Sequence, residues 1–278
     1  MSSGGNRGRG GNGRGRARVK RQQVESEDGW TVITHGLSKV SLDPKNKKEV
    51  AGALPSTTVK GLTPDKLMSE FEKLQERWKD TAVATQIADL LGEKKWDVSE
   101  AVCIGIGSFS RDWEHRWRSM WQLVLFMDVM QRLGRKMQMY AQDPAFTSID
   151  IDFLRLLSIT VVEFGIESHI SPRSFVFSPF VDWYILLPTF LKDKGPVLYV
   201  GNEILDDYSV YAQGKDKREK LGMCNELGKR FLEGRESVKV REFEGHAHAL
   251  NGMRVYWKTN TSAQETEEAL AQKDTSPG

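Results

Sequence analysis

The stretch Ala101–Ser110, AVCIGIGSFS, constrains the fold of this chain more than any other. Small and apolar residues lead directly into Gly105, Gly107 and Ser108, a pattern typical of a buried strand that ends at a tight glycine turn. A long apolar segment, residues 117–133, follows at once. Strand, glycine turn and helix in this order open a doubly wound α/β domain, in which the turn aims a helix N-terminus at a ligand. This turn is therefore the first place to expect a binding site.

The rest of the chain continues this alternation of extended and helical patterns. Helices are expected over residues 63–92, 116–133, 147–157, 181–191 and 215–232. Strands are expected over residues 101–106, 136–142, 159–164, 174–178, 196–200, 238–243 and 253–257, with the last two antiparallel at an edge. Pro188 is expected to kink or break the helix that contains it. This order predicts an α/β fold: a Rossmann-like three-layer domain with a mostly parallel sheet, helices on both faces and disordered termini.

Two helix starts are marked by their capping residues. Thr63-Pro64-Asp65 combines an N-cap hydroxyl, a proline at the first helical position and an acid in the first turn. Thr147 and Asp150 have the spacing of a capping box, in which each residue's side chain bonds to the other's backbone. The helices that follow should therefore begin at these positions.

Composition divides the chain into four parts. Residues 1–29 are a Gly/Arg-rich basic arm with almost nothing to bury, and we expect them to be disordered. Residues 30–62 hold a short tryptophan motif, interpreted either as a small edge strand or as a docking motif, followed by a linker. Residues 63–258 form the α/β domain, and residues 259–278 are expected to be a disordered polar tail.

The basic arm carries a signal of its own. From Met1 to Val24 there are seven Arg or Lys residues and no acid. Arginines spaced by glycine attract phosphates and stack on bases, which predicts weak, salt-dependent RNA contact through residues 1–23. A solubilising tail and a nuclear import signal are the alternatives. The arginines concerned are Arg7, Arg9, Arg14, Arg16 and Arg18.

Several classes of protein are disfavoured by composition. No stretch approaches eighteen consecutive apolar residues, so a membrane span is not expected. The basic N-terminus lacks the apolar segment of a secretory signal. Two cysteines, Cys103 and Cys224, are too few for a disulfide framework or a cysteine-rich zinc site. These features predict a cytoplasmic or nuclear protein.

Candidate ligand-binding residues follow four of the predicted strands, because ligands in such folds bind outside the carboxyl ends of the strands. Asp143 could grip a ribose hydroxyl, or it could simply close a turn with the proline that follows it. Gln122 lies in the most apolar part of its helix, and its amide could bond to a loop backbone or orient the glycine turn or a ligand. The full set is Gly105, Gly107, Ser108, Gln122, Asp143, Pro144, Pro179, Gly201 and Asn202.

Catalytic and metal-binding patterns are weaker. Glu114 and His115 could serve as acid and base, but no nucleophile is recognisable nearby, so a solvated helix start is the favoured interpretation. His246 and His248 could share one face of a strand and bind a metal, yet no further ligand is evident and a surface pair is favoured. We therefore assign no catalytic residue, no metal ligand and no cofactor from the sequence.

Residues from about Ala101 to Tyr208 resemble the SRR-like domain, the Sensitivity to Red Light Reduced family, in a fungal-type form. The resemblance rests on the order and spacing of short motifs. It implies a Rossmann-like fold and a regulatory role, in light and clock signalling in plants and in housekeeping or cytoskeletal functions in fungi, with no firmly attached enzyme activity. The matching motifs are GIGSF at 105–109, QL at 122–123, DPAFT at 143–147, SP at 178–179, GN at 201–202 and the upstream DGWTV at 28–32.

This chain departs from the family pattern at two places. Where the family usually has Pro-His-Cys, it has Pro179-Phe180-Val181, and where a serine is common it has Glu203. The first change removes a polar pair that could bind a metal or act as a nucleophile, and both changes make chemistry at this site less expected. Together with the regulatory role that the resemblance implies, this predicts a regulatory protein that binds a partner protein or a nucleotide-like ligand at the strand ends. The alternatives are a transferase-like enzyme using a nucleoside-containing cofactor, or an RNA-associated protein acting through its arm.

Overall fold

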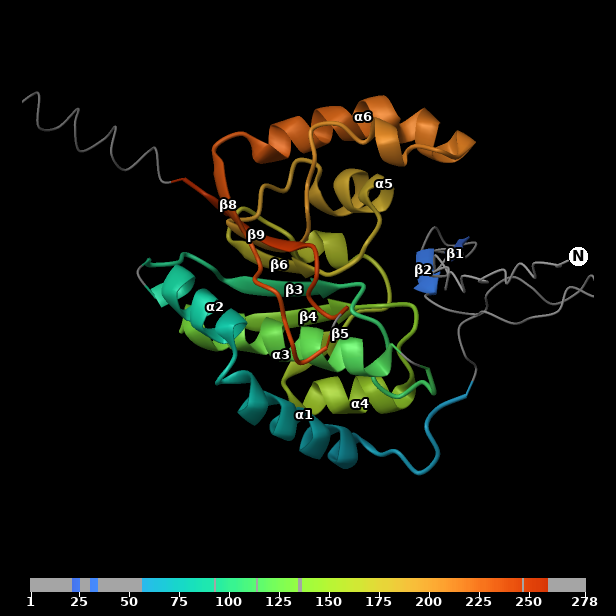
Figure 1. The fold of residues 1–278 in the computed structure, drawn as a ribbon, viewed down its shortest axis with the longest axis vertical. Coiled ribbons are helices and arrows are strands. Elements are labelled where there is room, and N and C mark those ends of the chain that lie inside the picture. Colours follow the sequence, from blue (N-terminus) through green and yellow to red (C-terminus); the bar gives the residue numbers. More distant parts are fainter. Residues whose placement is uncertain are drawn as a thin grey trace, which may run out of the picture.

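A seven-stranded sheet with helices on both faces forms the centre of the molecule (Figure 1). The computed structural model describes residues 22–25, 31–34, 57–92, 94–113, 115–134, 137–246 and 248–259. The strands of the central sheet are β3 (Glu100–Ile104), β4 (Gln138–Gln142), β5 (Ile159–Val161), β6 (Ser174–Ser178), β7 (Leu198–Asn202), β8 (Arg235–Lys239) and β9 (Met253–Lys258). The predicted α/β, Rossmann-like architecture is confirmed.

The strands run in the order β5-β4-β3-β6-β7-β9-β8. Strands β3 to β7 are parallel, whereas β9 is antiparallel to both β7 and β8, as the sequence predicted for the last two strands. The chain first adds β4 and β5 on one side of β3 and then crosses to place β6 and β7 on the other side. The order thus reverses between β3 and β6, the position at which ligands bind in doubly wound sheets.

The first predicted helix is divided into two. Helix α1 (Pro64–Trp78) begins after Thr63, whose hydroxyl accepts a hydrogen bond from the backbone N–H of Lys66, as predicted. Helix α2 (Ala82–Gly92) begins after Thr81, whose hydroxyl accepts from the N–H of Ala84. A single helix over residues 63–92 was therefore the wrong prediction, because the Thr81 side chain caps a second helix after the turn at residues 79–81.

The remaining long helices fall where the sequence predicted them. They are α3 (Arg116–Leu133), α4 (Ser148–Leu156) and α6 (Lys215–Leu232). Helix α4 has the predicted capping box between Thr147 and Asp150. Figure 1 shows α1 to α4 on one face of the sheet and α5 and α6 on the other, and each face has its own hydrophobic core.

The segment over residues 181–191 is broken, as expected around Pro188. It consists of a single turn, α5 (Trp183–Ile185), followed by a π-helical segment, η2 (Leu186–Leu191). Proline cannot donate the backbone hydrogen bond that an α-helix requires at this position. Two short 3-10 helices, η1 (Ile166–His169) and η3 (Ser209–Tyr211), lie in loops.

Two strands have different bounds from those that the sequence predicted. Strand β5 stops at Val161, earlier than residue 164, and β8 occupies Arg235–Lys239 rather than residues 238–243. The apolar residues that suggested a strand over 238–243 include Val240 and Phe243, which are indeed buried. Phe243 packs against the helices, with its ring centroid 4.9 Å from that of Trp121, so its burial comes from helix contact rather than from strand pairing.

The described N-terminal residues form a separate two-stranded antiparallel sheet, β1 (Gln22–Glu25) with β2 (Thr31–Thr34). Strand β2 corresponds to the small strand expected near Trp30, whereas β1 lies within the part of residues 1–29 that the sequence predicted to be disordered. The five arm arginines, Trp30 itself and residues 260–278 lie outside the described residues.

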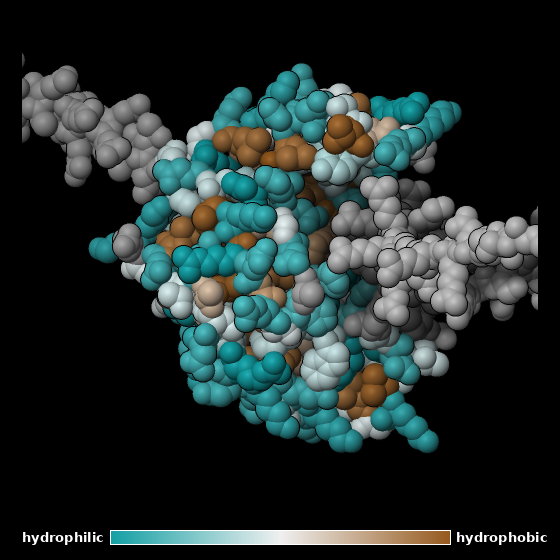
Figure 2. Space-filling view, viewed as in Figure 1, coloured by the Kyte–Doolittle hydropathy of each residue, from teal (hydrophilic) through white to brown (hydrophobic). Residues whose placement is uncertain are grey.

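On the face seen in Figure 2, the surface of the described residues is mainly hydrophilic, with separate apolar areas between the hydrophilic ones. No helix in the described ranges is long and apolar enough to cross a membrane.

Candidate functional site

The glycine turn after β3 packs tightly against the domain. Gly107 has a φ of +83°, a conformation that suits glycine, and a Cβ at this position would lie only 2.7 Å from the Ser119 hydroxyl oxygen. Gly105 also has a positive φ, of +72°. Close packing against α3 leaves no room for a side chain at Gly107. The glycine is therefore explained by packing, without a ligand.

Asp143 binds this turn from the end of β4. Its Oδ2 accepts a hydrogen bond of 2.6 Å from the Gly107 N–H, and its Oδ1 accepts one of 2.7 Å from the Ala145 N–H. Burial raises the pKa of the Asp143 carboxyl to about 6, although the two backbone N–H groups act in the opposite direction. Both carboxylate oxygens are thus used inside the protein, which favours the turn-closing interpretation over the ribose grip.

A second carboxylate, Asp150, holds the rest of the loop. It accepts hydrogen bonds from the Ser108 hydroxyl at 2.6 Å, from the Phe109 N–H at 3.0 Å and from the Thr147 N–H at 2.8 Å. Ser108 and Asp150 are both fully buried. The Ser108 hydroxyl therefore faces the interior of the protein rather than a ligand. The capping box identified Asp150 as a cap, but its contact with the β3 loop was not foreseen.

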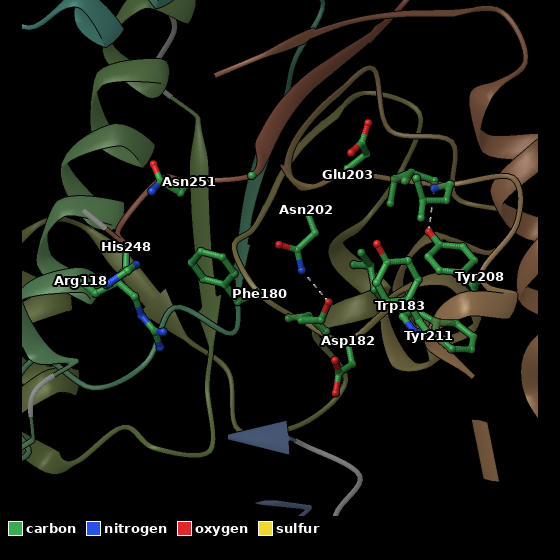
Figure 3. Close-up of a pocket in the computed structure, with 15 residues that line it drawn as sticks. Arg118, Phe180, Asp182, Trp183, Asn202, Glu203, Tyr208, Tyr211, His248 and Asn251 are labelled. Atoms are coloured by element: carbon green, nitrogen blue, oxygen red, sulfur yellow. Dashed lines mark hydrogen bonds between the residues drawn. The ribbon is translucent and has the colours of Figure 1, made fainter. Parts of the chain in front are cut away.

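A cavity of about 400 Å³ lies beyond the carboxyl ends of β6 and β7 (Figure 3). Four stretches of chain line it: helix α3, the segment from the end of β6 through α5 to the start of η2, the segment from the end of β7 to η3, and the loop before β9. This position is next to the reversal of strand order. The volume falls in the range of pockets that hold drug-sized ligands.

One wall of the cavity is aromatic. The rings of Trp183 and Tyr208 are stacked, with centroids 4.7 Å apart and planes inclined by 16°. The Tyr208 hydroxyl accepts a hydrogen bond of 2.9 Å from the Leu205 N–H, which fixes the ring from behind. Tyr211 is more than half exposed and also lines the cavity. Figure 3 shows these three aromatic residues together on one side.

The opposite side carries polar residues. Arg118, His248 and Asn251 lie together there in Figure 3, with Phe180 between them and Asn202. The guanidinium of Arg118 lies 5.2 Å from the centroid of the Phe180 ring. Phe180 has a φ of +74°, which is rare for a residue with a bulky side chain. Strain of this kind concentrates at functional sites, where the surrounding structure enforces it.

Hydrogen bonds from side-chain amides to backbone carbonyls fix the loops that carry these residues. The Gln122 amide donates a hydrogen bond of 2.9 Å to the Ala249 carbonyl, which anchors the loop bearing His248 to α3. The Asn202 amide donates one of 3.1 Å to the Val181 carbonyl and thereby joins the loops after β7 and β6. Gln122 thus bonds to a loop backbone, which is the simpler of the two interpretations of its buried amide.

Acidic side chains stand at the edge of the cavity. Asp182 precedes α5, and Glu203 follows β7 and forms an ion pair of 3.3 Å with Arg254. Figure 3 places them on opposite sides of Asn202. The cavity therefore combines stacked rings, a guanidinium and two carboxylates within one binding volume.

Comparison with known proteins assigns the family. A model of the SRR1 domain matches residues 71–257, which include all of the central sheet except the last residue of β9. The chain belongs to the SRR1 domain family. The cavity residues of this SRR1 domain all lie within the matched range.

Two solved structures match part of the chain at low sequence identity. One is described as cofactor-bound Rv0187 from MTB, at 9% sequence identity and a TM-score of 0.36, covering 70% of this chain and 90% of that one. The other is the O-methyltransferase from Bacillus cereus in complex with SAH, at 11% identity and a TM-score of 0.38, covering 70% and 91%. No curated protein sequence matches the chain.

The predicted binding residues are only partly brought together in this SRR1 domain. Asn202 lines the cavity, and Pro179 is buried directly before Phe180. Gly201 is packed rather than open, because a Cβ there would lie 2.3 Å from the Ser178 carbonyl oxygen. The others lie outside the cavity lining: Gly105, Gly107, Ser108, Gln122, Asp143 and Pro144.

Several residues that line the cavity were not among the predicted binding residues. Phe180 was considered only as a departure from the family pattern, and Arg118 lies just after the helix start at Glu114 and His115 that was interpreted as solvated. Trp183 and Tyr208 carried no signal, because their stacking depends on how two loops meet. Sequence position could not reveal this, since aromatic residues are common in cores and loops alike.

The two weaker candidate pairs, Glu114 with His115 and His246 with His248, were considered for catalysis and metal binding. The solvated helix start was the wrong interpretation for His115, because this residue is buried, with its ring 5.5 Å from that of Trp113. Glu114 lies outside the described residues. Burial lowers the pKa of His246, aided by the neighbouring charge of His248. Within the described ranges, no group of three or more His, Cys, Asp or Glu side chains is placed to hold a metal ion.

Proposed function

We propose that this SRR1-domain protein acts by binding a nucleotide-like small molecule in the cavity beyond β6 and β7, and that this binding serves a regulatory role. The observation that carries the proposal is the cavity itself, which combines an aromatic wall with charged groups at the carboxyl ends of β6 and β7, next to the reversal of strand order. Ligands of doubly wound domains bind outside the carboxyl ends of the strands, near this reversal.

The aromatic wall suits a planar heterocycle. Trp183 is held in a stack with Tyr208, so the wall is already formed before a ligand arrives. A preorganised ring surface gains stacking and apolar contact at little cost in side-chain entropy. The exposed Tyr211 adds a further ring at the same cavity.

The charged groups suit the rest of a nucleotide. Arg118 supplies a guanidinium, the side chain whose geometry best matches a phosphate. Asp182 and Glu203 supply carboxylates that can accept hydrogen bonds from sugar hydroxyls. A ligand with a ring at Trp183 and a phosphate toward Arg118 would span the cavity along the direction seen in Figure 3.

One common class of catalysis finds no support in the lining. Many acyl and group transfers use a serine, threonine, cysteine or lysine nucleophile next to a base. Among the described residues that line the cavity, none is of these four types. The lining instead offers shape, stacking and charge.

Calorimetric titration of the full-length protein with adenosine, AMP, ATP and S-adenosylmethionine tests the proposal. We expect at least one of these probes to bind, and Trp183→Leu to raise its dissociation constant about tenfold, the equivalent of about 1.4 kcal/mol. Trp117→Leu is the matched control, since Trp117 is a partly exposed tryptophan on α3 outside the cavity lining.

Two results would overturn this proposal. One is the absence of binding by all four probes to a folded protein. The other is equal affinity in the wild type and in the Trp183→Leu variant, which would place the binding elsewhere. Circular dichroism of each variant verifies that the fold is retained.

A further inference from the structure

A second cavity, of about 290 Å³, lies at the opposite end of the sheet from the first. It is bounded by residues 192–195 before β7, the C-terminal part of α6, the start of β8 and the end of β9. Because β9 is antiparallel to β7, the end of β9 lies next to the start of β7, with Trp257 opposite Leu198. Neither the sequence motifs nor the proposed nucleotide site involves these residues.

Two positive charges face each other across strands at this cavity. Arg235 on β8 is the direct cross-strand partner of Lys258 on β9, and both residues line the cavity. Like charges at directly opposite positions destabilise an antiparallel pair. An anion between or beside them would remove this repulsion.

Arg235 is held firmly in place. Its Nη2 donates a hydrogen bond of 2.6 Å to the Pro196 carbonyl, and its guanidinium lies 4.3 Å from the centroid of the Phe231 ring. Its Nη1 is buried and has no hydrogen-bond partner in the described structure. Burial lowers the pKa of Arg235 to about 10. Partial desolvation, together with the charge of Arg235, lowers the pKa of the largely exposed Lys258.

The nearby acids do not neutralise these cations. Asp193 forms its ion pair with Arg230, at 3.5 Å, and Glu233 is exposed. Within the described residues, no carboxylate lies within ion-pair distance of Arg235 or Lys258. The lining thus carries five basic residues and two acids: Lys192, Lys194, Arg230, Arg235 and Lys258 against Asp193 and Glu233.

The rest of the lining is apolar. Leu187 and Leu191 come from the π-helical segment η2, and Leu227 and Phe231 come from α6. All four side chains are buried. A ligand at this site would therefore meet positive charge at one part of its surface and hydrocarbon at another.

We propose that this cavity is a binding site for a small organic anion, one that carries a carboxylate or phosphate group on an apolar body. The charged group would compensate Arg235 and Lys258, and the apolar body would lie against the leucines and Phe231. Guanidinium and ammonium groups bind both kinds of anion through charge-assisted hydrogen bonds.

The test is an amide NMR titration of the isotope-labelled full-length protein with phenyl phosphate, phenylacetate and the neutral analogue phenol. We expect saturable shifts at residues 192–195, 227–235 and 258 with at least one anion, and much weaker shifts with phenol. The preferred anion distinguishes a phosphate ligand from a carboxylate ligand. Because the site is charged, the affinity should fall as salt is added.

Lys258→Gln is the main variant, since this side chain is exposed and its loss should leave the fold intact. We expect the dissociation constant of the preferred anion to rise about fivefold, as for loss of one charge partner at a partly exposed site. Arg235→Gln should weaken binding further. Arg155→Gln, on the exposed surface of α4, is the matched control and should change nothing.

The proposal is overturned if neither anion shifts these residues, if phenol binds equally well, or if the Lys258→Gln variant retains wild-type affinity. Shifts confined to the loops around Trp183 would also overturn it, because they would assign the anion to the first cavity. The two proposals can thus fail independently.

Discussion

Replacing Asp143 with asparagine should change how the stability of this protein depends on pH. In the folded protein burial raises the pKa of this carboxyl from an ordinary value of 3.8 to about 6. At a pH between these two pKa values, Asp143 is mostly protonated in the folded state and mostly ionised in the unfolded state. The free energy of unfolding must therefore fall as the pH rises through this window, because the folded state binds more protons than the unfolded state.

The size of this effect follows from the pKa values. One pKa unit corresponds to about 1.4 kcal/mol, so a rise to about 6 corresponds to about 3 kcal/mol. Because Asp143 is only partly buried, we expect solvent screening to reduce this loss of unfolding free energy to about 2 kcal/mol. Asparagine does not titrate, although its amide would face the N–H groups of Gly107 and Ala145 and lower stability by a pH-independent amount.

Guanidinium denaturation, followed by tryptophan fluorescence from pH 4 to pH 7.5, measures this difference. We expect the free energy of unfolding of the wild type, relative to that of Asp143→Asn, to fall by about 2 kcal/mol as the pH rises over this range. Asp152→Asn, which removes an exposed carboxylate on α4, is the control and should run parallel to the wild type. Parallel profiles for Asp143→Asn would refute the reasoning. An advantage that grows with pH would show that the two backbone hydrogen bonds outweigh burial.

Two substitutions and one labelling experiment test the packing of the domain. Gly201→Ala should reduce the free energy of unfolding by about 3 kcal/mol in chemical denaturation, because its Cβ would lie 2.3 Å from a backbone oxygen of β6. Gln122→Leu should cost about 1–3 kcal/mol and speed hydrogen exchange in residues 246–252, because the Ala249 carbonyl loses its buried donor. Cys103 and Cys224 should resist a thiol reagent until the protein unfolds, because burial raises the pKa of both thiols.

Each of these changes has a control or a contradicting result. Gly222→Ala, in the middle of α6, meets nothing within 4 Å and should stabilise the helix by up to about 1 kcal/mol. Equal effects of Gly201→Ala and Gly222→Ala would contradict the packing argument. Unchanged exchange in Gln122→Leu would show that other contacts hold the loop. Rapid labelling of either thiol in the native protein would contradict its burial.

Local signals predicted most of the elements. The hydroxyl of Thr63 and the capping box at Thr147 placed two helix starts correctly, because capping depends on residues within one turn. The same kind of signal at Thr81 was overlooked, and one helix was predicted where there are two. Phe243 misled the strand prediction, since an apolar residue buried against helices looks the same in sequence as one buried in a sheet.

The sequence predicted a candidate site only in its general position. The rule that ligands bind at the carboxyl ends of strands pointed to the edge of the sheet where the cavity lies, and Asn202 lines that cavity. Asp143 was interpreted either as a ribose ligand or as part of a turn, and both of its carboxylate oxygens are bonded within the protein. An acid after a strand has the same sequence signature whether it binds a ribose or a backbone N–H.

The sequence by itself determined the alternation of strands and helices, the capped helix starts and the break at Pro188. These features depend on periodicity, capping and backbone geometry within a few residues. Only the tertiary structure decided which polar groups meet one another. Arg118 and His248 lie far apart in the chain but line one cavity, and Arg235 opposes Lys258 only through the pairing of β8 with β9. Such contacts depend on long-range packing, which no local pattern encodes.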